Sequence, residues 1–473
     1  MLYHVKYIRE GRFTDCLISK EDGGMKRVHD MTRGSVWECL LGFSIPIMLS
    51  NLLQSTYNAV DMLFVGQFTG TESLAAVSVC GPIMNVMVIT LSGMSAGVLV
   101  IISGLLGAEE TEQVQEAAHT SVALYTSMAI IITVTGILFV PEILQLVRTP
   151  SAAMGEAKKY LYTIFAGTIF SFGYNLMGAL QRGMGNAMAS MEFVIVSSVV
   201  NIVLDFIFIA WLRMGAFGAA LGTVLSQVVA FGMGVIQFAK KDSVIHLSLK
   251  DIRFHTKHLK SILLFGVPTA LNEVMVNLAM LTVSGVANSF GLAASAAYGV
   301  GSRINSLAIF SDGAMNQTMS AYASQNVGKG KQKRALDGLK KSILLSAGIA
   351  VCTAIIVYIF ADKFSACFDD DPEVIEQSVL FLKVTVWSYP LFATVGPLIG
   401  FIRGTGNIEA SLLVGIVAQL FCRIPASFLF AGWIGFQGVG IAVLIGPLVS
   451  VMIYSWYIFT GRWHRGLIRV EKL

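Results

Sequence analysis

The sequence predicts an all-α integral membrane protein with twelve transmembrane helices in two halves of six. Two observations carry the helical membrane prediction. The 473-residue chain is 55% hydrophobic and only 13% charged, whereas soluble domains carry about 25% charged residues. Its apolar runs are roughly 20 residues or longer, which is the length of a membrane-crossing helix and not of a barrel strand. Helices satisfy their own backbone hydrogen bonds, as lipid requires.

A third observation, an internal repeat, predicts the two halves. The segment Arg182-Gly-Met-Gly-Asn186 returns as Arg403-Gly-Thr-Gly-Asn407, and 403 − 182 = 221 residues. Pro46 and Pro268 recur at nearly the same offset, since 268 − 46 = 222. Many secondary transporters are built from a duplicated helical bundle with its interface at mid-membrane. The repeat therefore indicates a translocation path between two lobes and not a soluble active site.

The expected order of segments follows from the apolar runs and the repeat. It is a cytoplasmic tail (1–36), a first lobe (37–239), a cytoplasmic linker (240–259), a second lobe (260–460) and a cytoplasmic tail (461–473). The expected spans lie near 37–62, 73–103, 116–140, 157–181, 187–212, 215–239, 260–287, 293–325, 337–360, 377–402, 408–431 and 437–460. Residues 1–24 lack the apolar region of a signal peptide, and we expect this extension to be dispensable.

Lysine and arginine are unevenly divided between the two sides of the membrane. They gather in the first tail, the linker, the segment 329–341 and the last tail, and few lie in the connections on the other side. The positive-inside rule then places both termini in the cytoplasm of a cell with a plasma (inner) membrane. This bias also explains the net charge of +4, so no nucleic-acid partner is expected. The expected partners are the bilayer and small organic substrates, with no obligate protein partner.

A charged side chain inside a membrane span costs several kcal/mol of insertion free energy, so each one needs a structural or functional explanation. Asp61 ends the first span, with Tyr57 four and Gln54 seven residues before it on one helical face. Asp205 follows Asn201 by four residues in the apolar run VVNIVLDFIFIAW. These stripes favour a polar cavity. The alternatives are that Asp61 lies at the outer interface and that Asp205 belongs to a structural polar pair.

The repeat is chemically asymmetric around these carboxylates. Thr223 and Gln227 form a further polar pair in the sixth span that can complete one pocket with the two aspartates. The second-half counterparts of Asp61 and Asp205 fall near Val283 and Ala426. We therefore expect a proton or sodium site in the first lobe only. A carboxyl group away from water can exchange a proton, whereas oxygens of Asp61, Asp205 and Asn201 can ligate sodium.

Two acidic residues of the second half, Glu273 and Asp312, also lie within expected spans, and Arg303 and Arg423 are their expected charge partners. A buried ion pair that pins helices together is one interpretation, and substrate contact or gating is the other. Pro46 and its repeat partner are expected to bend the first helix of each half, and such bending can gate access.

The sequence offers little for other chemistries. The six cysteines show no metal-ligand spacing, no phosphate loop or nucleophile triad appears, and no cofactor is expected beyond the coupling ion. An integral-membrane enzyme would need histidines and carboxylates near one membrane face. The histidines are instead scattered along the chain, at His4, His29, His119, His246, His255, His258 and His464.

The motifs together resemble the multidrug and toxic compound extrusion (MATE) family over about residues 31–460. They are GFSIPIMLSNLLQSTYNAVDMLFVGQFTG, the turns QRGMGN and IRGTGN, NIVLDFIFI, and SQNVGKG. The resemblance implies two six-helix lobes in a V, related by a pseudo-twofold along the membrane normal. It also implies antiport of organic, often cationic, compounds against protons or sodium. The family's first-lobe site residues fall on Pro46, Tyr57, Asp61, Asn201, Asp205 and Thr223.

One departure separates this chain from NorM-like members of that family, which carry an acidic residue in the tenth span. The segment FLKVTVWSYPLFATVGPLIGFIRG has none, so the DinF-like pattern fits better. The resulting hypothesis is an efflux antiporter in which protonation of Asp205 and Asp61 bends the first helix and expels substrate. The alternative is a flippase of a lipid-linked sugar or another amphiphile, for which Arg303 and Arg423 would be the cations that face pyrophosphate.

Overall fold

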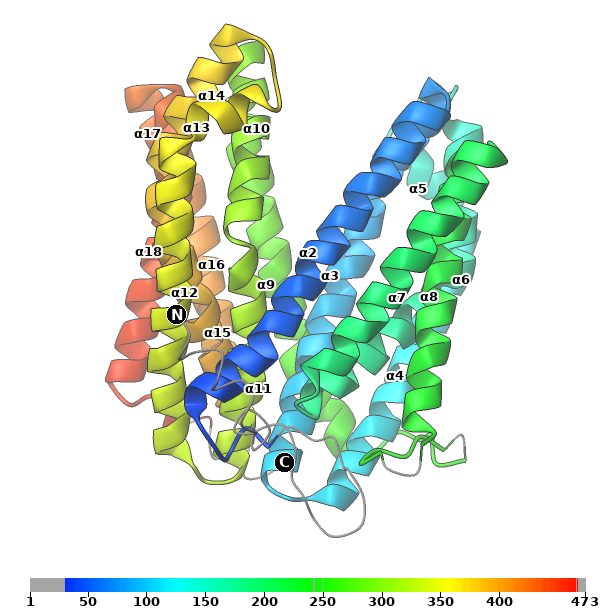
Figure 1. Ribbon diagram of the computed structural model, residues 1–473, viewed down its shortest axis with the longest axis vertical. Coiled ribbons are helices and arrows are strands. Elements are labelled where there is room, and N and C mark those ends of the chain that lie inside the picture. The colour runs from blue at the N-terminus through cyan, green and yellow to red at the C-terminus, as the bar shows by residue number, and fades with distance from the viewer. Residues whose placement is uncertain (1–29, 241–242, 249, 465, 467–473) are drawn as a thin grey trace, which may run out of the picture. The chain divides into compact units, whose positions relative to one another are not determined.

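The computed structural model describes residues 30–240, 243–248, 250–464 and 466, and every regular element within them is helical (Figure 1). The expectation for residues 1–24 falls outside this part of the chain. Eleven helical stretches of the described residues are long and apolar enough to cross a membrane. The all-α membrane fold expected from composition is therefore confirmed.

The eighth expected span, 293–325, differs from the other spans because it is broken. It consists of α10 (Leu292–Ala308) followed by α11 (Phe310–Gly328), and the chain leaves helical geometry at Ile309. The Ile309 N–H still bonds the Asn305 carbonyl oxygen at 3.0 Å. With α10 and α11 taken as one segment, the structure has the twelve membrane-length segments of the predicted fold.

Eight helical elements of the described residues form the first half. They are α2 (Val36–Phe68), α3 (Thr71–Gly107), α4 (Thr111–Leu138), α5 (Val140–Leu146), α6 (Met154–Gly183), α7 (Ala187–Asp205), the π-helix η1 (Phe206–Trp211) and α8 (Gly215–Phe238). The helix α6 packs against α3, α4 and α8, and α7 packs against α8. A Cβ at Gly167 of α6 would overlap Val224 of α8, so small residues allow this close contact.

The helices of the second half pack closely along α11 and α15. They are α9 (Thr256–Asn288), α10, α11, α12 (Gln332–Ile359), α13 (Ala361–Ala366), α14 (Pro372–Thr385), the 3₁₀ turn η2 (Val386–Ser388), α15 (Tyr389–Gly404), α16 (Ile408–Ile416), the π-helix η3 (Val417–Arg423), α17 (Ile424–Ile434) and α18 (Phe436–Phe459). Gly404 of α15 faces the backbone of α11, since a Cβ there would lie 2.7 Å from the Ser320 carbonyl oxygen.

The repeated arginine-glycine motif forms the same turn in both halves. Gly185 and Gly406 have φ angles of 83° and 86°, which glycine adopts without strain. The arginine that opens each motif reaches forward to the next helix. Arg182 donates to the Ser190 hydroxyl at 2.7 Å, and Arg403 donates from Nε to the Ser411 hydroxyl at 3.3 Å. Each arginine thus ties its turn to a serine eight residues later.

The contacts divide the described chain into two compact units that do not follow the repeat at its first helices. Unit 1 contains 45–266, and unit 2 contains 31–44 together with the chain from 267 onward. The start of α2 therefore packs with unit 2, and the start of α9 packs with unit 1. The units divide after Ser44 on α2 and after Gly266 on α9. Pro46 and Pro268 therefore each lie two residues past a division.

Candidate functional site

Four of the predicted site residues lie on the part of α2 that belongs to unit 1, namely Pro46, Gln54, Tyr57 and Asp61. Pro46 has no N–H, so the carbonyl of Gly42 lacks its usual helical partner. The Ser50 hydroxyl donates to the Pro46 carbonyl oxygen at 2.8 Å. Farther along this helix, Tyr57 and Asp61 are half-buried. The Asp61 Oδ1 atom is buried without a hydrogen-bond partner among the described residues.

Asn201 and Asp205 occupy the last turn of α7, where the helix changes its winding. Both are buried, with 2% and 0% exposure. The Asn201 amide donates to Asp205 Oδ1 at 3.4 Å, whereas Asn201 Oδ1 and Asp205 Oδ2 have no partner among the described residues. The π-helix η1 begins directly after Asp205. Single π turns inside helices often mark functional sites.

The helix α8 approaches Asp205 with its backbone. A Cβ on Gly222 would lie 2.6 Å from Asp205 Oδ1, so a side chain there would displace the carboxylate. Thr223 is half-buried next to this glycine, and its carbonyl oxygen accepts from the Ser226 hydroxyl at 2.8 Å. Gln227, one turn on, accepts a hydrogen bond from Ser171 of α6. The structure thus gives Gln227 a helix-to-helix contact, and Gln54 of α2 is exposed.

The aspartates of α2 and α7 lie within electrostatic range of each other. Tyr160 of α6, which sequence reasoning missed, is buried within range of Asp61, Asp205 and Tyr57. Among the ion pairs between described residues, none includes either aspartate. The site therefore presents two carboxyl groups with buried oxygens and no lysine or arginine paired to them.

Gly222 and Tyr160 were missed for different reasons. In the sequence, Gly222 belongs to the spacing Gly218-x-x-x-Gly222, which is typical of close helix packing, although it directly precedes Thr223. Tyr160 lies in the first turns of its span beside two lysines, where the sequence KKYLY is typical of an interface. No periodic signal separates this tyrosine from an interfacial anchor.

The acidic residues of the second half lie in unit 2 and face a different cation from the one expected. Glu273 and Asp312 are half-buried. Arg403, the arginine of the IRGTGN turn, is within electrostatic range of both carboxylates and is only 4% exposed. The buried Arg403 within range of these two carboxylates fits the structural interpretation of a charged pin.

The expected partners Arg303 and Arg423 lie elsewhere, which corrects the sequence-based pairing. Arg303 is exposed. Arg423 is buried at the end of η3, where it donates from Nη1 to Gln419 Oε1 at 3.3 Å. The expectation was wrong because it selected arginines by their position within spans, whereas Arg403 lies at a span end and reaches inward. The sequence marks Arg403 only by its recurrence at the 221-residue offset, which does not indicate its charge partners.

Comparison with known proteins gives consistent matches along the whole chain. The family model MatE matches residues 46–207 and again residues 268–429. The chain is 27% identical to the probable multidrug resistance protein YpnP of Bacillus subtilis, over 94% of this chain and 100% of that protein. It is 25% identical to the multidrug export protein MepA of Staphylococcus haemolyticus, over 90% of this chain and 94% of that protein.

Solved structures share the fold. One is an outward-facing conformation of a multidrug resistance MATE family transporter of the MOP superfamily, with a TM-score of 0.85 and 24% identity over 94% of this chain and 98% of that chain. Another is a MOP superfamily transporter from Pyrococcus furiosus, with a TM-score of 0.86 and 24% identity over 92% of this chain and 98% of that chain. The two family-model matches coincide with the two copies of the sequence repeat.

Proposed function

The chain belongs to the multidrug and toxic compound extrusion family, and from this premise we propose that it exchanges organic, often cationic, compounds for protons or sodium. As a member it is a multi-pass membrane protein and a multidrug efflux transporter. The relatives named above are multidrug transporters, which points away from an enzyme. The cation exchange is the proposed part of this function.

The observation that supports exchange is the pair of carboxyl groups that lack a basic partner. An ionised carboxylate inside a membrane is costly unless something neutralises it. In this site a proton, a sodium ion or a cationic substrate can do so. Because each would neutralise the same carboxylates, binding of one disfavours binding of the others. Mutual exclusion of this kind is what couples inward movement of an ion to outward movement of a substrate.

The α2 helix supplies a way to turn occupancy into access. Protonation or sodium binding at Asp61 and Asp205 would remove the attraction that holds a cationic substrate. Bending of α2 near Pro46 would then open or close the site, because that residue interrupts the hydrogen-bond ladder of the helix. Loss of the ion on the inner side would restore the negative charge and readmit substrate.

The buried oxygens of this site can bind either of the two proposed coupling ions, a proton or sodium. Asp61 Oδ1, Asp205 Oδ2 and Asn201 Oδ1 are buried oxygens without partners among the described residues, and oxygen ligands suit a hard cation such as sodium. A proton needs only the carboxyl groups. Tyr57 and Thr223 are proposed to complete the coupling site. Gln54, Gln227, Glu273, Asp312 and Arg303 stay predictions for substrate contact or gating.

The orientation belongs to the proposal as well. The lysines and arginines of the linker and of the 329–341 connection lie on the side that the positive-inside rule assigns to the cytoplasm. With twelve spans, both termini share that side of the plasma membrane.

The test is transport of a fluorescent organic cation in proteoliposomes under an imposed proton or sodium gradient. Wild type, Asp205→Asn and the exposed control Asp362→Asn are compared at equal incorporation. We expect one gradient to drive uptake in wild type and the control, with loss of at least about tenfold in Asp205→Asn, because an uncharged amide cannot exchange the ion. Full transport by Asp205→Asn would overturn the mechanism. No gradient-driven movement of any cation would favour the amphiphile flippase.

A further inference from the structure

The linker between the two halves is docked on α4 by specific hydrogen bonds within unit 1. The Gln115 amide holds the linker backbone in both directions, donating to the Val244 carbonyl oxygen at 2.6 Å and accepting from the His246 N–H at 3.1 Å. One turn on, His119 Nε2 accepts from the Ser248 N–H at 3.4 Å. The linker thus follows the first turns of α4 instead of extending freely into solvent.

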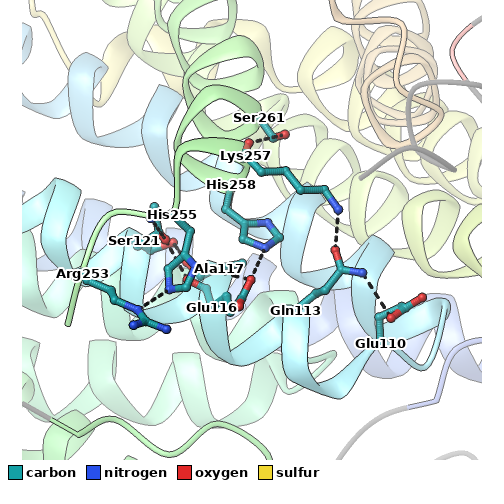
Figure 2. A network of polar contacts seen from close by, with 11 residues as sticks. Glu110, Gln113, Glu116, Ala117, Ser121, Arg253, His255, Lys257, His258 and Ser261 are labelled. Atoms are coloured by element: carbon teal, nitrogen blue, oxygen red, sulfur yellow. Dashed lines mark hydrogen bonds and ion pairs between the residues drawn. The ribbon is translucent and has the colours of Figure 1, made fainter. Parts of the chain in front are cut away.

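The docking continues into the first turn of α9 through one carboxylate shared by two imidazole rings (Figure 2). Glu116 Oε2 lies 3.5 Å from His255 Nδ1 and 3.2 Å from His258 Nε2. The backbone N–H of His255 donates to the Thr120 hydroxyl at 3.2 Å. On its far side, His255 Nε2 accepts from Arg253 Nε at 3.0 Å. We call the docked residues 244–248 and 250–258, with their α4 partners, the linker clasp.

Each of the three rings in the linker clasp makes contacts that suit a neutral imidazole. His119 and His255 use Nε2 as an acceptor, which a protonated ring cannot do because both its nitrogens carry hydrogen. The His258 side chain is 1% exposed, and its Nδ1 is buried without a partner among the described residues. A proton added there would be a buried N–H with no acceptor, which is costly.

The surrounding charges do not offset these losses. The rings face Arg253 from the linker and Lys257 from α9, whose Nζ donates to Gln113 at 2.8 Å. That glutamine in turn donates to Glu110 at 3.2 Å. Protonated rings would gain attraction to Glu116, but its side chain is 35% exposed and solvent screens it. Three new positive charges would join those of Arg253 and Lys257, and Glu116 lies within ion-pair distance of only two of the three rings.

We propose that the linker clasp is a proton-sensitive latch, closed when its three histidines are neutral and released when they take up protons. Histidine is the side chain that changes charge between about pH 5 and 8. Release frees the start of α9 at Thr256 from α4, and this helix divides between the two units after Gly266, where 266 − 256 = 10 residues. On the proposed orientation the latch faces the cytoplasm, and it is separate from the aspartate site.

Unit 2 contains a clasp of another chemistry at the start of α2, which serves as an internal control. Arg334 of α12 donates to the carbonyl oxygens of Met31, Arg33 and Gly34 at 3.3, 2.7 and 3.0 Å. Gln325 of α11 accepts from the Met31 N–H at 3.1 Å. Arginine stays protonated and the glutamine amide stays neutral between about pH 5 and 8, the range in which histidine changes charge.

The test is hydrogen–deuterium exchange of the purified full chain at pH 7.5, 6.5 and 5.5, with labelling times scaled for the intrinsic pH dependence of exchange. We expect the peptide 244–262 to lose protection as the pH falls, by about tenfold per pH unit for each proton taken up on opening. The peptide 30–36, held by Arg334, should not change. Equal protection of 244–262 at all three pH values would overturn the proposal.

Two variants make the result specific to the rings. The triple change His119→Gln, His255→Gln and His258→Gln keeps amide donors and acceptors but removes the titration, so its exchange should be independent of pH. Glu116→Gln weakens the contacts to both α9-side rings and should raise exchange of 244–262 already at pH 7.5. An unaltered pH response in the triple variant would assign it to other groups. Exchange in α6 peptides reports whether each variant is folded, and none of these readouts requires transport.

Discussion

The two halves of this transporter each hold a pair of acidic side chains within their helices, but only one pair lies within electrostatic range of an arginine. None of the four carboxylates takes part in an ion pair between described residues. For Asp61 and Asp205 of the first half, no lysine or arginine of the described residues lies within electrostatic range. Glu273 and Asp312 of the second half lie within range of the buried Arg403. A carboxylate with a fixed cation needs no mobile one, whereas a carboxylate without it must take up a proton, sodium or substrate. The difference separates a structural pin from an exchange site.

Removal of the arginine in the second half should cause the largest loss of stability among these variants. Arg403→Gln leaves Glu273 and Asp312 without their cation, and breaking a buried charge pair from one side costs about 3–5 kcal/mol. The matched control is Arg303→Gln, an exposed arginine in the same half, which should change stability by less than about 0.5 kcal/mol. Thermal unfolding in detergent measures both. Equal losses in the two variants would contradict the assignment of Arg403 as the partner.

The same chemical change in the two acidic pairs should have opposite effects on stability. Asp312→Asn takes a carboxylate from beside Arg403 and should lower the free energy of unfolding by roughly 1–3 kcal/mol. Asp205→Asn removes a buried carboxylate that has no cation, so it should leave the unfolding temperature unchanged or raise it. Thermal unfolding near neutral pH compares them. A larger destabilisation from Asp205→Asn would mean that this aspartate has a structural partner.

The smallest expected effect concerns the glycine that gives Asp205 its space. Gly222→Ala places a Cβ 2.6 Å from Asp205 Oδ1, and overpacking of this kind costs about 1–3 kcal/mol, offset by about 1 kcal/mol of helix propensity. Gly232→Ala on the same helix meets open space and should be neutral or slightly stabilising. Transport in proteoliposomes should fall in the first variant alone. Undiminished transport by Gly222→Ala would show that the carboxylate tolerates displacement.

The fold could be predicted because lipid imposes simple rules on composition and length. Spans, repeat and family follow from apolar runs and recurring motifs, and each can be read locally. Asp205 could be found for the same reason, since an aspartate in an apolar run is expensive. The break at Ile309 could not, because no proline or glycine marks it. The cluster around Arg403 could not either, because it depends on where a long side chain points.

The linker clasp is the feature that local sequence patterns predict least well. The sequence shows scattered histidines and a polar connection between the halves, which predict only a cytoplasmic linker. Glu116 and His258 are 142 residues apart, and no periodicity connects them. Their meeting depends on how α9 begins against α4, which is a tertiary event.

The exchange of first-helix starts between the two units has a consequence for biogenesis. During synthesis, the segment 31–44 emerges first, but its partner Gln325 is made 294 residues later. The first turns of α2 therefore cannot make these contacts until most of the protein has been translated. A gene cut at the linker would yield two fragments, each lacking the polypeptide that completes its own bundle. Duplication produced two similar modules, yet each now requires the other to finish its assembly.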